Sequence, residues 1–220
     1  MMQRDVPCPL PEHPLLREAA TVYQDAGHWA WIVDRDWRIA FMTDEARIAW
    51  ASRDGRFAPV AVGHHLFSSE SMALRDDWRF GLTTVDLWRA FFRFVGGLVL
   101  HDTDGGRDAL RDLVDASIAD LVGELEPHDV AVYGGTLLAA GLGKVDESKM
   151  VIHRVRGADG TLAGSVITGK PPAGMSVLIG LSWYRDADHL ERMERFTTSG
   201  RYPAAILFAD LEGSSELSRT

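Results

Sequence analysis

The residues with the clearest chemical potential follow an apolar run near the end of the sequence. Residues 204–209, Ala-Ala-Ile-Leu-Phe-Ala, have the composition of a fully buried strand. Asp210 ends this run, and Gly213, Ser214 and Ser215 follow as a natural helix start, because serine hydroxyls cap helix N-termini. A carboxylate at a strand end, beside free backbone N–H groups, can hold a metal ion and face a polyphosphate. The pattern indicates Asp210 as a metal ligand and the Gly-Ser-Ser segment as phosphate-facing.

The string ILFADLEGSS, residues 206–215, resembles the opening strand of class III adenylate and guanylate cyclase catalytic domains. Their pattern is apolar-Phe-x-Asp-apolar-x-Gly-Phe/Ser-Ser/Thr. The resemblance implies that Asp210 is the first of two metal-binding aspartates and that the backbone carbonyl of Leu211 completes part of the site. It implies two divalent ions, Mg²⁺ or Mn²⁺, that assist attack of the ribose 3′-hydroxyl on the α-phosphate and release of pyrophosphate. The alternative is an ordinary strand that ends in Asp before a serine-capped helix.

The other functional residues of the family have no counterpart before the last residue, Thr220. They are the second metal aspartate, the base-selecting residues, and the asparagine and arginine that act on the transition state. Cyclase sites also form between two catalytic domains. We therefore expect a catalytically incomplete, homodimeric regulatory part, with residues 201–220 as the start of a cyclase domain. ATP or GTP would bind only to the full-length enzyme, and the sequence leaves open which of the two.

A linker helix is expected at 184–200, between the two halves. Acidic residues come first in the segment 186–196 and arginines come late, which is the order that the helix dipole favours. Four apolar residues recur at steps of three: Ala187, Leu190, Met193 and Phe196. This stripe could pack on a sheet or on its twin in a dimer, and we expect it to pass a signal to the cyclase. An ordinary surface helix is the alternative.

The patterns in the rest of the chain predict an α+β fold with an antiparallel sheet. Helices are expected at 14–26 and 45–51. Two apolar stripes, one from Leu87 to Val95 and one from Leu110 to Leu125, predict further helices within 71–125, and Pro127 would end the last of them. Strands are expected at 29–33, 38–42, 130–133, 150–156, 161–168 and 175–183. Hairpins rather than helical crossovers join the strands, so the sheet is antiparallel.

This order of hairpin, helices and terminal meander resembles the PAS sensor fold. The segments that carry the resemblance are 31–39, with its Asp-containing turn, and 155–164, with its Gly-Ala-Asp-Gly turn. The resemblance implies a PAS-like sensor domain at 29–183 with a long helical insertion at about 71–125. Residues 1–28 would be a leader and capping helix. The alternative to a cyclase regulator is a free-standing PAS-like protein that binds a small ligand and has no enzymatic activity.

Aromatic residues recur through the proposed sensor domain. They are Trp29, Trp31, Phe41, Trp50, Phe67, Trp78, Trp88 and Phe91. Such residues could line a pocket for an apolar ligand or fill a core, and a core is the expected outcome. The identity of a sensor ligand does not follow from the sequence.

Two glycine-rich stretches lack residues that binding loops require. In the stretch 134–144, Leu138 stands where a P-loop needs Gly, and Val145, the residue after the stretch, stands where it needs Ser or Thr. A structural loop is therefore expected at 134–144. The segment from Asp102 begins like a calcium loop, but Leu113 occupies its twelfth position, and a polar turn between helices is expected instead.

Composition and charge argue against several classes of partner and site. The 220 residues carry 23 Lys and Arg against 32 Asp and Glu, a net charge of −9, which argues against a nucleic-acid-binding surface. The single cysteine, Cys8, excludes an internal disulfide and a multi-cysteine metal site. The longest apolar stretch, 91–100, is too short to span a membrane and contains Arg93. We expect a cytoplasmic protein with neither a nucleic-acid nor a membrane partner.

Overall fold

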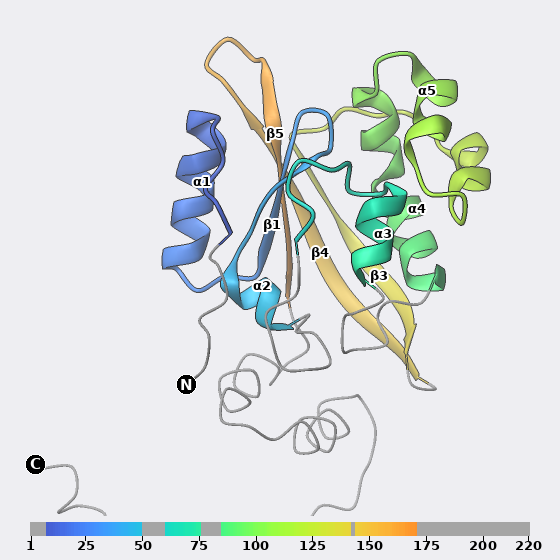
Figure 1. The fold of residues 1–220 in the computed structure, drawn as a ribbon, viewed down its shortest axis with the longest axis horizontal. Coiled ribbons are helices and arrows are strands. Elements are labelled where there is room, and N and C mark those ends of the chain that lie inside the picture. Colours follow the sequence, from blue (N-terminus) through green and yellow to red (C-terminus); the bar gives the residue numbers. More distant parts are fainter. Residues whose placement is uncertain (1–7, 50–59, 76–84, 142–143, 171–220) are drawn as a thin grey trace, which may run out of the picture.

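The computed structural model describes residues 8–49, 60–75, 85–141 and 144–170 (Figure 1). In chain order the elements are α1 (Pro14–Asp25), β1 (Ala30–Asp34), β2 (Ile39–Met42), α2 (Asp44–Ala49), α3 (Ser69–Arg75), α4 (Val85–Asp102), α5 (Gly106–Leu113), the 3₁₀ helix η1 (Ala119–Glu124), β3 (Val132–Gly141), β4 (Lys144–Arg156) and β5 (Leu162–Lys170). No helix within these ranges is long and apolar enough to cross a membrane.

The strands form one antiparallel sheet in the order β2-β1-β5-β4-β3. The β1–β2 hairpin and the β3–β4–β5 meander meet where β1 pairs with β5, so the first and last strands lie at the centre. The helices from α3 to η1 lie between β2 and β3 in the chain. The predicted α+β class is confirmed, and the arrangement is consistent with a PAS-like sheet that carries a helical insertion.

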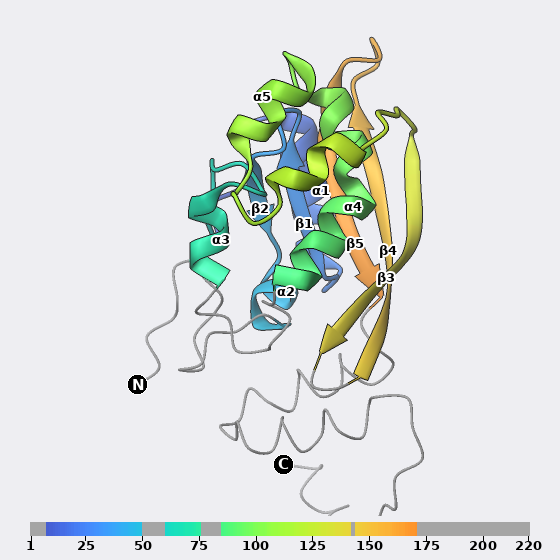
Figure 2. The ribbon, with the colours of Figure 1, turned by 90° about the vertical axis from the view of Figure 1, so that its right-hand side faces the viewer.

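Side-chain alternation along the strands gives the sheet two apolar faces. Ile32 and Val166 are buried on one face together with Leu16 and Ala20 of α1. Trp31 and Ile167 are buried on the opposite face, in the core that includes α4. Figure 1 shows α1 on one side of the sheet and α3, α4 and α5 on the other, and Figure 2 shows this second layer in front of the sheet. The sheet is therefore the middle of three layers.

The first apolar stripe forms the helix that the sequence predicts. In α4, Leu87, Trp88, Phe91, Phe92 and Val95 are all buried, because their spacing places them on one helical face against the sheet. The terminal hairpin is also confirmed, with β4 and β5 joined by a turn at 157–161.

The second apolar stripe, from Leu110 to Leu125, does not form one helix. The prediction that a helix runs through it and ends at Pro127 is wrong. Helix α5 stops at Leu113, and the N–H of Asp115 donates instead to the carbonyl of Phe67, at 2.8 Å. The Asp115 carboxylate accepts from both the N–H and the hydroxyl of Ser117, at 2.9 and 2.6 Å. These local bonds compete with helical ones, so the chain turns before η1 begins. The stripe is still buried from Leu110 to Leu125 except at Leu113, which is 42% exposed.

The predicted loop at 134–144 is also wrong, because β3 runs from Val132 to Gly141. The strand predicted at 130–133 forms from Val132 onward and is longer than expected. Every residue of β3 is paired with β4, which begins at Lys144. A Cβ at Gly135 would lie 2.8 Å from the ring of Phe94 in α4. Gly135 thus marks a close approach of α4 to the strand rather than a loop.

Replacing Gly164 by alanine is expected to lower the free energy of unfolding by about 2–3 kcal/mol. Gly164 is paired with Asp34 in β1, and a Cβ there would overlap the carbonyl oxygen of Val33 and lie 2.9 Å from Cα of Asp34. Backbone atoms in the sheet centre cannot move aside. Urea denaturation of both proteins measures the change. Gly169→Ala is the matched control in the same strand, since its Cβ would meet nothing closer than 3.6 Å. Equal stability of the two variants would contradict the prediction.

Candidate functional site

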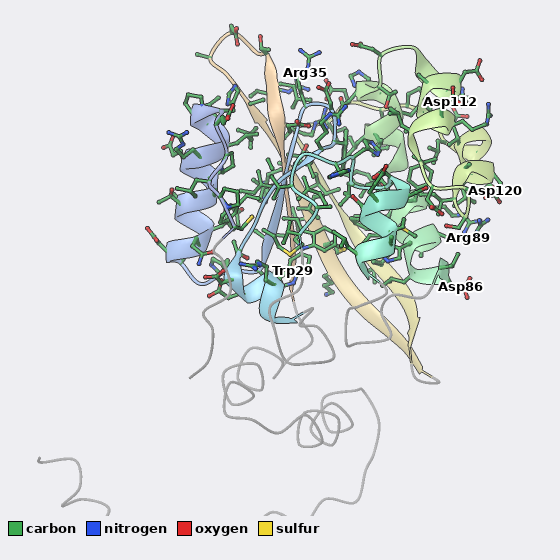
Figure 3. The ribbon with its side chains drawn as sticks, viewed as in Figure 1. Trp29, Arg35, Asp86, Arg89, Asp112 and Asp120 are labelled. Atoms are coloured by element: carbon green, nitrogen blue, oxygen red, sulfur yellow. The ribbon has the colours of Figure 1, made fainter. Side chains whose placement is uncertain are left out.

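Three indole rings stack between the sheet and α4. Trp29 and Trp31 lie with ring centroids 5.6 Å apart and planes at 26°, and Trp31 and Trp88 lie 5.9 Å apart at 10°. Alternation in β1 turns Trp31 toward α4, whose buried face supplies Trp88. Trp29 precedes β1 and is half-buried at the end of the sheet near α2, where Figure 3 labels it. The stack therefore runs from the edge of the core to its centre.

Phe67 closes the inner side of this aromatic cluster. It is fully buried, and its ring centroid lies 4.9 Å from that of Phe92, 5.6 Å from that of Phe91 and 6.3 Å from that of Trp88. The prediction that these aromatic residues fill a core is confirmed for Trp31, Phe67, Trp88 and Phe91. Phe41 is buried on the opposite face under α1, and Trp50 and Trp78 lie outside the described residues.

A buried charged network links the end of α4 to the sheet. Arg154 of β4 donates two hydrogen bonds of 2.5 Å to the two carboxylate oxygens of Asp102, the last residue of α4. The side chain of Arg154 is 0% exposed and that of Asp102 is 4% exposed. Trp37 donates its indole N–H to the same carboxylate at 2.7 Å, and Arg154 also donates to the hydroxyl of Ser165 in β5, at 3.2 Å. One carboxylate thus joins α4, the β1–β2 turn and the middle of the sheet.

The β1–β2 turn holds Trp37 in an unusual backbone conformation. Its φ is 58°, in the left-handed region that bulky side chains rarely adopt, and its side chain is 1% exposed. The Asp34 carboxylate organises the turn by accepting the N–H groups of Asp36 at 3.0 Å and Arg38 at 2.8 Å. Burial raises the pKa of the Asp34 carboxyl, although these two backbone bonds oppose the shift. The conformation of Trp37 is maintained from both sides, by Asp34 and by Asp102.

Further charged groups surround the buried pair. The Nδ1 atom of His101 lies 3.1 Å from Asp102, and the Asp129 carboxylate lies 4.0 Å from Arg154 and accepts two bonds from Arg156, at 2.6 and 2.7 Å. The Nε atom of Arg154 is buried and has no hydrogen-bond partner in the described part of the chain.

A second two-bond ion pair of similar geometry lies on the surface of the helical layer. Arg89 of α4 donates to the two carboxylate oxygens of Asp120 in η1, at 2.7 and 2.6 Å. The Asp120 side chain is 61% exposed, and Figure 3 shows the two residues side by side at the outer side of the helices. Arg35, also labelled there, lies at the β1–β2 turn. The two pairs differ mainly in burial, so Arg89 and Asp120 provide a control for Asp102 and Arg154.

A further carboxylate, Glu45 in α2, is partly buried. Its Oε2 atom is inaccessible to solvent and has no hydrogen-bond partner among the described residues. Burial raises the pKa of Glu45, and the neighbouring Asp44 carboxylate adds to the shift, while its own backbone N–H and the positive field of His28 oppose it. The ionised form is therefore less favourable in the folded protein than in the unfolded chain.

Glu45→Gln is expected to raise stability at neutral pH, by less than about 1 kcal/mol because solvent screens part of the side chain. A pKa raised by folding gives stability that is present in acid and lost as pH rises through the folded value. The difference between variant and parent should therefore grow from about pH 4 upward and then level off. Urea denaturation at a series of pH values measures it, with Glu12→Gln as the exposed control. A difference that is constant with pH would contradict the prediction.

The residues that the sequence analysis assigned to a site all lie outside the described residues. They are the metal-site residues Asp210 and Leu211, the phosphate-facing Gly213, Ser214 and Ser215, and the linker residues Ala187, Leu190, Met193 and Phe196. The predicted strand at 175–183 lies outside them as well. In the part of the chain that the structure describes, no three His, Cys, Asp or Glu side chains are grouped as a metal site.

Sequence analysis missed the pairing of Asp102 with Arg154. The sequence patterns place Asp102 in a polar turn and Arg154 at a polar position of an alternating strand. A signal was present in β4, where Met150 and Ile152 are buried at alternate positions and Arg154 is the next residue on that face. An arginine at an inward position requires a buried acid, but the sequence does not identify which one.

None of the protein-family models matches the chain, and no significant match was found among the curated proteins.

Proposed function

We propose that this chain comprises the sensor and dimerisation part of a class III nucleotide cyclase together with the first strand of the catalytic domain. The observation that carries the proposal is the unbroken string at 206–215, with Phe208, Asp210, Gly213 and Ser214 all in register with the cyclase pattern. In the full-length enzyme, Asp210 and the carbonyl of Leu211 would hold Mg²⁺ or Mn²⁺. That metal would assist conversion of ATP or GTP to a cyclic nucleotide and pyrophosphate.

The described fold is compatible with the sensor part of this proposal. A hairpin, a helical layer and a meander enclose an aromatic core. The last strand, β5, ends at Lys170, and the sequence continues from there toward Asp210. In the proposal, a change in this domain would pass through the expected linker helix at 184–200 to the catalytic domain. The chain would act as a homodimer, because cyclase sites form between two catalytic domains.

The proposal is tested first by the coding sequence that follows Thr220 and then by an assay. A second aspartate in a strand-turn-strand segment is expected downstream. The full-length polypeptide should convert ATP or GTP to the cyclic nucleotide with Mg²⁺ or Mn²⁺, and deletion of residues 1–183 should change the rate. Absence of the downstream aspartate, or no cyclic nucleotide with either substrate and either metal, would contradict the proposal.

The second candidate is a small-ligand-binding signalling protein without enzymatic activity, and the half-buried Trp29 at the end of the indole stack favours it. An apolar ligand would have to bind at this end, because the rings of Trp31 and Trp88 are already packed in the core. Native mass spectrometry and an absorption spectrum of the purified chain test this candidate. A retained mass or a visible band would support ligand binding, whereas the bare mass at all protein concentrations would oppose it.

A further inference from the structure

We propose that the Asp102 carboxylate is a conformational latch between the helical layer and the sheet. When closed, it holds Trp37 in the left-handed conformation; when open, it lets the β1–β2 turn relax while the two layers remain folded. The latch consists of three side chains, Asp102, Arg154 and Trp37, and does not depend on the proposed cyclase activity.

The latch adds a polar connection between three elements that otherwise meet through apolar packing and the sheet. Asp102 is the last residue of α4, Arg154 lies within β4, and Trp37 lies in the turn between β1 and β2. The three hydrogen bonds to the carboxylate measure 2.5, 2.5 and 2.7 Å, and they leave the acid almost fully buried. A shift of α4 along the sheet must either carry Arg154 and Trp37 with it or break these bonds.

The closed state carries three energetic costs, one at each residue of the latch. Trp37 has a φ of 58°, which costs a non-glycine residue conformational energy. Asp102 places a negative charge at the C-terminal end of α4, where the helix dipole is already negative. The Nε atom of Arg154 is buried without a partner in the described residues. The hydrogen bonds from Trp37 and Arg154 to Asp102 offset these costs, so the conformation of the turn is less favourable without them.

The hydrogen bonds of the turn show where an open latch would be detected. The carbonyl of Trp37 accepts the N–H of Leu66 at 2.8 Å, and the N–H of Trp37 donates to the backbone carbonyl of Asp34 at 3.1 Å. Leu66 precedes Phe67, which packs on Trp88 and Phe91 of α4. Opening of the latch therefore changes the turn at 34–38 and the segment leading to the aromatic cluster, both distant in sequence from Asp102.

Hydrogen exchange of the 220-residue chain, resolved to single amides by NMR, tests the latch. Asp102→Asn keeps the shape of the side chain but removes the charge. We expect exchange at the amides of Trp37 and Leu66 to become at least about tenfold faster relative to the β4–β5 ladder amides. Asp120→Asn removes the exposed acid from the comparable pair with Arg89 and should leave these amides unchanged. Acceleration confined to the last turn of α4, or equal acceleration throughout the protein, would overturn the proposal.

A paired replacement separates a latch from a structural ion pair. In Asp102→Leu with Arg154→Met, the buried charges are gone and the apolar side chains can pack, so the β4–β5 ladder should regain its protection. The indole of Trp37 still lacks its acceptor, so the turn amides should remain fast. Recovery of the turn amides together with the ladder would overturn the proposal.

Trp37→Phe tests the latch without a change at Asp102, and it is used if neither Asp102 variant folds. It preserves the ion pair and a buried ring but removes the indole donor. Faster exchange at Leu66 and at the amide of residue 37, with the β4–β5 ladder unchanged, is expected. Parent-like exchange at both positions would overturn the proposal.

Discussion

Asp102→Asn is expected to lower the free energy of unfolding by about 3–5 kcal/mol, the range found when one partner of a buried ion pair is removed. Arg154 cannot reach water, because its side chain is 0% exposed, so its charge would remain buried beside a neutral amide. Asparagine also replaces an oxygen that accepts from Arg154 with an N–H₂ group. The loss is a large fraction of the stability of a domain of this size.

Urea denaturation followed by circular dichroism measures the effect, and the exposed pair provides the control. Asp120→Asn likewise replaces one of the two oxygens that accept from Arg89 at nearly the same lengths, but water can solvate both groups, so only a small change is expected. The two variants therefore compare a buried ion pair with an exposed ion pair of nearly the same geometry. Similar losses in the two variants would show that burial of the Asp102–Arg154 pair does not decide its contribution.

If the proposed cyclase function holds, Asp210→Ala is expected to reduce cyclic nucleotide formation by the full-length protein at least about a thousandfold. Metal ions in such a site contribute several kcal/mol of charge stabilisation in the transition state, and a thousandfold corresponds to about 4 kcal/mol. Because Asp210 would be one of only two aspartates that hold the metal, its loss should remove most of that contribution. The kcat/KM for cyclic nucleotide formation, measured with saturating Mn²⁺, reports the change.

Glu212→Ala is the matched control for Asp210→Ala. Glu212 is a carboxylate two residues further along the same string, at a position where the cyclase pattern accepts any residue. Its replacement should leave kcat/KM within a fewfold of the parent. An enzyme that keeps its activity without Asp210, or loses it equally without Glu212, would remove the basis of the cyclase proposal.

Sequence patterns predict well the elements whose side chains alternate or recur at one period. Leu87, Trp88 and Phe91 establish α4 because helical spacing and burial agree, and the β4–β5 hairpin follows from alternation around a Gly-Ala-Asp-Gly turn. Strand β3 is hard to predict at Gly134 and Gly135, because glycine is typical both of loops and of strands that a neighbouring side chain approaches closely. Only the position of Phe94 distinguishes the two cases.

The buried network could not be predicted because its parts come from distant places in the sequence. Asp102 and Arg154 are 52 residues apart, and Asp102 and Trp37 are 65 apart. Local patterns identify each residue as polar, but the partner depends on how α4 lies across the sheet. The break after Leu113 has the same origin, since the bond from Asp115 to Phe67 depends on tertiary packing that no local period encodes.

The central pairing of β1 with β5 has a consequence for how the protein folds. The hydroxyl of Thr168 bonds to the carbonyl of Trp29 across a separation of 139 residues. Closing so long a stretch of chain is entropically costly, and folds with many distant contacts form slowly. On the ribosome, β1 can pair with β2 early, but it can pair with β5 only after β5 has emerged. The centre of the sheet can therefore be completed only after residues 162–170 have been synthesised.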